Sequence, residues 1–144
     1  MVDFRLDYFE GQLAQQILGD AIGVATWVDT RVFPDIAPEG TVLPYITFAD
    51  ITAQRAYHMT GDTGLTHNHV VQIDCWSDEP AESRQIAGKV IELLSAVQAT
   101  WGTQIDVRRS HLASMAREYV PDGDGSEKGA WRTRMDWEFA YRDA

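Results

Sequence analysis

A stretch near the C-terminal end of the chain alternates between two kinds of side chain. Residues 129–142 read GAWRTRMDWEFAYR, with mostly aromatic or apolar residues at the odd positions and mostly charged residues at the even ones. Because successive side chains of a β-strand point to opposite faces, this alternation predicts a strand with one face on a core. The residues expected to face the core are Trp131, Met135, Trp137 and Phe139. The other face carries Arg132, Arg134 and Arg142, interleaved with Asp136 and Glu138.

The charged face of this strand has two possible roles. It can be a solvated sheet face whose cross-strand ion pairs each contribute little to stability. It can also be a polar subunit interface, because the planar guanidinium of arginine binds carboxylates in a bidentate manner. In that case the more acidic N-terminal part of one copy could meet the arginines of the next. Composition alone leaves both roles open.

Apolar residues recurring every three or four positions predict two helices. The first stripe consists of Leu6, Phe9, Leu13 and Ile17. The second follows Pro80 and consists of Ile86, Val90, Leu94 and Val97. We expect the first helix to end near Gly19 and the second at Gly102, because glycine commonly follows a helix C-terminus.

Runs rich in β-branched and aromatic residues predict strands at residues 45–59, 65–76, 104–119 and 131–141. Glycine-containing turns separate the first two runs and the last two, so each pair predicts a long hairpin. A change of apolar phase near Ser110 indicates a bulge, and the proline-rich segment 31–44 is expected to be extended with little regular pairing. We therefore expect a single α+β domain over residues 1–144. Its mostly antiparallel sheet would be built from two long hairpins, with two helices packed on one face.

The charge balance argues against tight binding to nucleic acid. The formal net charge is −10, and Lys89 and Lys128 are the only lysines. Binding to a phosphate backbone requires clustered basic residues that displace counterions. An acidic surface could nevertheless lie near DNA without adhering to it.

The single cysteine, Cys75, excludes an internal disulfide. Its neighbours have the composition of a strand, so we expect a buried thiol that behaves as a small hydrophobic residue. No stretch is long enough to cross a bilayer and no export signal is visible, so we expect a soluble protein without a membrane partner.

Three short motifs resemble catalytic or metal-binding sites, and each has a simpler explanation. His67 and His69 share one face of a predicted strand, with His58 across the turn, but a catalytic zinc needs a third protein ligand and an open position. Polar residues at an exposed strand end are the simpler explanation of these histidines. The triplet at residues 62–64 is that of aspartic proteases, yet its setting is a hairpin turn. Residues 122–125 fail the spacing of a calcium loop. We expect no catalysis, metal or cofactor.

Several stretches, taken in order, resemble phage tail-completion proteins, also called tail terminators or head–tail joining proteins. They are residues 35–40 (DIAPEG), 43–48 (LPYITF), 59–65 (MTGDTGL) and 71–76 (VQIDCW). The apolar stripe of the second predicted helix continues the likeness, which covers roughly residues 5–100. The last two predicted strands resemble the family in their arrangement more than in their residues, and residues 122–129 do not align with it.

That resemblance implies a subunit that assembles with copies of itself into a ring, typically of six, on the tail tube of a long-tailed phage. The implied partners are other copies, the tail tube protein and the head connector or stopper. DNA would pass through the lumen without specific binding. The implied location is the virion, at the head–tail junction, after assembly in the host cytoplasm.

Within this picture the tip of the first predicted hairpin is expected to reach a neighbouring subunit or the tube. The residues concerned are Tyr57, His58, Met59, Leu65 and His67. Arg132 and Arg134 are expected at the contact between subunits. Two alternatives from other classes are a module that binds a small acidic ligand or carbohydrate on the exposed sheet face, and an enzyme that uses the histidine cluster.

Overall fold

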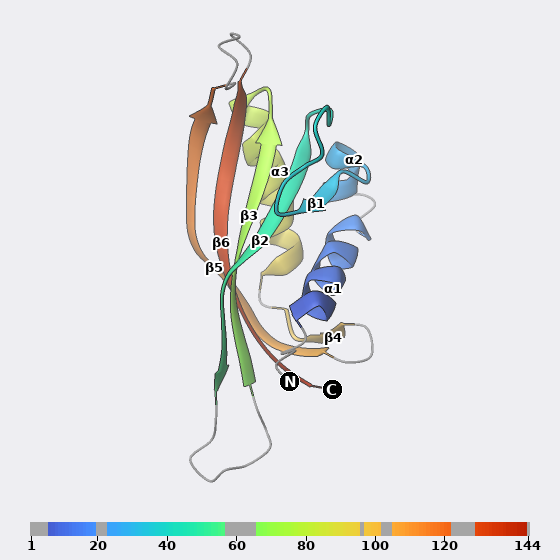
Figure 1. Cartoon of the computed structure of the whole chain (residues 1–144), viewed down its shortest axis with the longest axis vertical. Helices are drawn as coiled ribbons and strands as arrows, with labels where there is room; N and C mark the ends of the chain where they lie inside the picture. Colours follow the sequence, from blue (N-terminus) through green and yellow to red (C-terminus); the bar gives the residue numbers. More distant parts are fainter. Residues whose placement is uncertain are drawn as a thin grey trace.

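Six strands form one sheet in the computed structural model, in the order β1-β2-β3-β6-β5-β4 (Figure 1). The structure describes residues 6–19, 23–56, 66–95, 97–101, 105–121 and 129–143. The strands are β1 (Val32–Pro34), β2 (Tyr45–Ala56), β3 (Thr66–Ser77), β4 (Ala99–Trp101), β5 (Ile105–Val120) and β6 (Ala130–Asp143). β1 runs parallel to β2, and the other neighbouring pairs are antiparallel.

The helices of the described chain lie on one face of this sheet (Figure 1). They are α1 (Leu6–Leu18), α2 (Val24–Val28) and α3 (Pro80–Leu94). Leu13 and Ile17 of the first predicted stripe are buried, and α1 ends where predicted, with the Gly19 amide donating to the Gln15 carbonyl at 2.8 Å. Pro80 opens α3, which packs against β3 and β6. The fold is therefore α+β.

The second predicted helix ends earlier than expected. α3 stops at Leu94 rather than at Gly102, and Ser95 is already extended, with φ −71° and ψ 132°. The hydroxyl of Ser110 on β5 donates to the Leu94 carbonyl and accepts the amide of Val97 at 2.8 Å. The end of the helix is thus set by a partner on a distant strand and not by the nearest glycine.

The segment 31–44 is more ordered than the sequence predicted, because it contains the short strand β1. Val32 pairs with Ile46 and is buried against the core. Its position next to β2 lets the Arg31 side chain donate to the Pro44 carbonyl at 2.8 Å. Three short elements have no counterpart in the sequence prediction, namely β1, β4 and the helix α2. They are three to five residues long, too short to leave a periodic pattern in the sequence.

The two pairs of long predicted strands are antiparallel neighbours in the sheet, β2 with β3 and β5 with β6. The residues that connect them, 57–65 and 122–128, lie outside the described chain. Along β5 the register shifts twice, between Val107 and Arg109 and between Leu112 and Ser114. These irregularities flank Ser110, where the sequence predicted a bulge.

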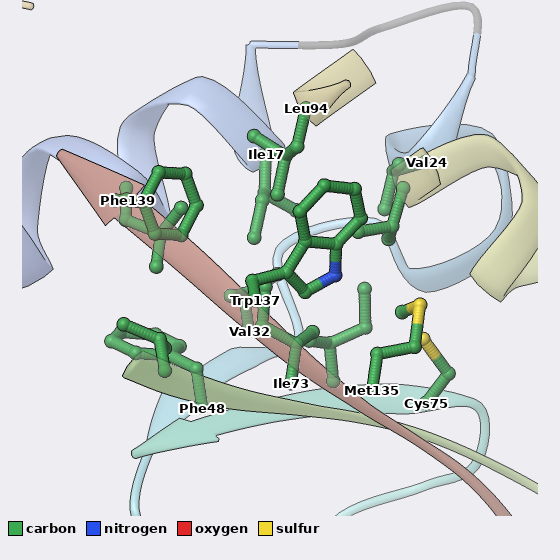
Figure 2. Packing of buried hydrophobic residues seen from close by; sticks show 14 of the residues in the cluster. Ile17, Val24, Val32, Phe48, Ile73, Cys75, Leu94, Met135, Trp137 and Phe139 are labelled. Carbon is green, nitrogen blue, oxygen red and sulfur yellow. The ribbon is translucent and has the colours of Figure 1, made fainter. Parts of the chain in front are cut away.

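The core fills the space between the sheet and the helices. Of the four residues expected there from β6, Met135, Trp137 and Phe139 are buried and Trp131 is half-buried. Figure 2 shows the Trp137 indole in the middle of the cluster, next to Ile17 and Leu94 from the helices. Cys75 is fully buried as expected, and this burial raises the pKa of its thiol, which therefore stays protonated.

Candidate interaction surfaces

The outer face, by which we mean the sheet face opposite the helices, carries the charged side chains of β6. The strand register places Tyr45, Trp76, Arg132 and Glu118 in one row across β2, β3, β6 and β5. The Tyr45 and Trp76 rings are stacked with centroids 5.9 Å apart. Aromatic residues and arginine are enriched at protein–protein interfaces, so the composition of this row is typical of a docking surface.

Arg132 is held within its own subunit. Its guanidinium lies over the Trp76 ring, 5.4 Å from the centroid, and pairs with Glu118 and with Asp74, the latter at 3.6 Å. The Arg132 side chain is only 22% exposed. Both terminal nitrogens of its guanidinium therefore already pair with carboxylates of the same subunit.

Asp74, beside Arg132, is a buried carboxylate on the outer face. Desolvation raises its pKa above the ordinary value of 3.8, and a hydrogen bond from Gln72 together with Arg132 and Arg134 offsets only part of this effect. A carboxyl whose pKa is higher in the folded than in the unfolded state stabilises the fold at low pH. That contribution is lost as the pH rises through the folded-state pKa.

We therefore predict that the stability of the wild type relative to Asp74→Asn falls as the pH rises from 3 to 7. The Asn variant lacks the titrating group but keeps the shape of the side chain. Urea denaturation of both proteins at several pH values measures the difference directly. A difference that grows with pH would mean that the arginines dominate over desolvation.

Arg134 is more accessible than Arg132. Its side chain is 44% exposed, and its Nε lies 3.6 Å from the carboxylate of Asp136, which also accepts a hydrogen bond from Ser114. Further along the same face His111 pairs with Glu138 at 2.9 Å. Most charged side chains of the outer face thus form ion pairs within the subunit. Of the two arginines predicted at the subunit contact, Arg134 is the one more accessible to a neighbouring copy.

Most of the predicted hairpin tip lies outside the described residues, namely Tyr57, His58, Met59 and Leu65. The backbone of His67 lies in β3, opposite Arg55 on β2 and Tyr141 on β6. His69, two positions further on, is buried, with its Nε2 3.3 Å from the Tyr141 hydroxyl and its Nδ1 3.9 Å from the Asp50 carboxylate. The sequence predicts an exposed position for His69, whereas in the structure its side chain is part of a buried polar cluster.

Within the part of the chain that the structure describes, no three His, Cys, Asp or Glu side chains are grouped so as to hold a metal ion. None of the described helices is long and apolar enough to span a membrane.

The loop of residues 35–44, between β1 and β2, is a possible contact that the sequence patterns do not indicate. Two of its apolar side chains face solvent, Ile36 at 83% and Val42 at 69% exposure. Its ends are fixed, because the Asp35 amide donates to the Phe48 carbonyl at 2.7 Å and Arg31 holds the Pro44 carbonyl. In the sequence, the proline content of this segment limits the conformations that the loop can adopt, but it does not indicate a contact.

A second surface lies on the far edge of the sheet. The β5 patch consists of Met115, Arg117, Tyr119 and Trp131. It is on the same face as the helices, because Met115 pairs with Met135 and Tyr119 with Trp131. Met115 is nevertheless 54% exposed and does not join the core. Arg117 lies over the Trp131 ring, and Tyr119 packs against that ring with centroids 5.4 Å apart.

The sequence also matches a known protein family. Residues 12–135 match the family model described as tail completion protein gp17. The chain belongs to this family. Phage tail structural proteins make up the family, so this tail completion protein is a structural component of a phage-type tail, found in the virion.

A solved structure shares the fold of this tail completion protein. It is a chain from the virion of a native gene transfer agent (GTA) particle, with a TM-score of 0.68 and 20% identity over 90% of each chain. At that identity the likeness shows the fold alone. No curated protein matches the sequence closely enough to count as a relative.

Proposed function

We propose that the protein is the tail terminator of a long-tailed phage particle. Copies of the chain, typically six, form a ring on the end of the tail tube, stop its growth and present a surface to the head connector. The observation that carries this proposal is the family match, which extends over residues 12–135. The related fold in a gene transfer agent virion supports a place in an assembled particle.

The charge of the chain suits a ring through which DNA passes. Its net charge is −10, and among the described residues the arginines Arg132, Arg134 and Arg142 are paired with carboxylates of the same subunit. A lumen formed by such a surface would repel the phosphate backbone rather than retain it. The proposed partners are the tail tube protein and the head connector or stopper.

The residues predicted from the sequence have defined places in this proposal. The segment 57–65 would reach a neighbouring subunit or the tube, as would His67 at the start of β3. Arg134 would contribute to the subunit contact, and Arg132 would support the same face from within, because Asp74 and Glu118 already bind it.

Electron microscopy of purified protein mixed with purified tail tubes tests the proposal. We expect a closed ring at one end of each tube, and tubes that no longer lengthen when tube protein is added. A variant lacking residues 59–65 should bind the tube ends less well while keeping its circular dichroism spectrum. Tubes that stay uncapped and continue to grow at saturating protein would refute the proposed function.

A further inference from the structure

Two exposed apolar surfaces lie at opposite edges of the sheet and at the same end of it. The loop of residues 35–44 leads directly into Tyr45, the first residue of β2. The strand register connects Tyr45 through Trp76 and Arg132 to Glu118, which lies within the β5 segment that carries the patch. Figure 1 shows both segments at the upper end of the sheet, with β5 on its left and the loop on its right.

These two surfaces are too far apart to contact each other within one subunit. Two strands, β3 and β6, separate β2 from β5. With neighbouring strands about 4.8 Å apart, β2 and β5 lie roughly 14 Å from each other. A contact between the loop and the β5 patch therefore requires two copies of the chain.

The two surfaces also have complementary charge. The loop contains Asp35 and Glu39 and no basic residue, and the patch contains Arg117. Among the described residues none of these three charges has an ion-pair partner, and both carboxylates are exposed. Arg117 is stacked on Trp131, 5.8 Å from the ring centroid, and in this position its N–H groups can still bind a carboxylate.

Both surfaces are preorganised, which lowers the conformational cost of docking. Gly40 supplies the positive φ of +82° that the loop requires, and Pro38 accepts the Thr41 amide at 3.1 Å. Beside the patch, Gly129 leaves room for the Tyr119 ring, since a Cβ at this position would approach the Tyr119 Cζ atom to 2.5 Å.

From this arrangement we infer that the loop of residues 35–44 of one copy docks on the β5 patch of the next copy. Ile36 and Val42 pack against Met115 and the Tyr119–Trp131 pair, and Glu39 binds Arg117. The contact is heterologous, because it joins different surfaces of the two copies, and a heterologous contact can repeat around a closed ring. The inference rests on the proposed function, and it names the surfaces that form the ring.

Cross-linking tests the contact at the level of single residues. The variants Val42→Cys and Met115→Cys can each keep Cys75, because that thiol is buried. A mixture of the two on capped tubes, treated with a short bis-maleimide, should give a covalent dimer that neither variant gives alone. A matched control replaces Met115→Cys with Gln98→Cys, an exposed position outside the patch, and should give no dimer.

A charge exchange tests the predicted partner. Arg117→Glu and Glu39→Arg should each weaken self-association at least tenfold, and the double variant should recover most of that loss. Arg109→Glu changes the same charge on the opposite face of the same strand and should have little effect. Analytical ultracentrifugation gives the association constants, and circular dichroism shows whether each variant is folded.

The outcomes separate this inference from the proposed function. Rings that cap tubes but give no 42–115 cross-link would overturn the contact and leave the function standing. If Arg117→Glu leaves self-association intact but abolishes tube binding, the patch binds a different protein and the inference is wrong. Absence of rings both in solution and on tube ends would refute the proposed function itself.

Discussion

Trp137→Ala is expected to lower the free energy of unfolding by about 3–5 kcal/mol, the largest effect of any single substitution that we predict. The indole is fully buried at the centre of the core, between α1 and α3 on one side and the sheet on the other (Figure 2). Alanine would leave a cavity that the surrounding strands and helices cannot fill without moving. For a chain of 144 residues this loss corresponds to a drop in melting temperature of roughly 10–20 °C.

Trp137→Phe is the matched control for this experiment. The indole Nε1–H is buried and has no hydrogen-bond acceptor among the described residues. Burying an unsatisfied donor costs about 1–3 kcal/mol, and phenylalanine removes that cost while leaving a smaller cavity. We therefore expect Trp137→Phe to be much closer to the wild type than Trp137→Ala in urea denaturation. Equal losses in the two variants would show that the donor does have a partner.

Arg132→Glu is expected to lower the free energy of unfolding by about 2–3 kcal/mol. Removing one partner of a buried ion pair typically costs about 3–5 kcal/mol, and Arg132 is partly exposed, so we place its effect below that range. The substitution would put a third carboxylate beside Asp74 and Glu118, and it would remove the cation from the Trp76 ring. Thermal denaturation measures the effect in the isolated subunit.

Arg134→Glu provides the comparison with Arg132→Glu. Arg134 is more exposed, and its Nε approaches the Asp136 carboxylate only to 3.6 Å, so we expect a loss below about 1 kcal/mol. If the outer face joins subunits, this variant should weaken ring formation while its melting temperature stays near that of the wild type. The sequence predicts both arginines at the subunit contact, but the internal contacts of Arg132 predict a folding defect for Arg132→Glu as well. A large drop in the melting temperature of Arg134→Glu would make this residue an internal support too.

The candidate surfaces were only partly predictable from the sequence. The alternation in residues 129–142 identified the charged face of β6, but not which carboxylates bind it, because Asp74 and Glu118 come from distant strands. His69 was misjudged for the same reason. Its neighbours come from other strands, and one of them, Tyr141 on β6, is 72 positions away in the chain.

Local patterns in the sequence determined the long elements of this protein. Period-two alternation fixed the faces of β6, and apolar spacing fixed the buried sides of α1 and α3, because these patterns reflect the geometry of a single segment. Tertiary structure decided the rest: the end of α3 at Leu94, the pairing of β1 with β2, and the exposure of Met115 beside a covered core. Each of these depends on which segments meet in the folded chain. A hydrogen bond or a buried contact between two distant segments leaves no periodic pattern in the sequence of either segment.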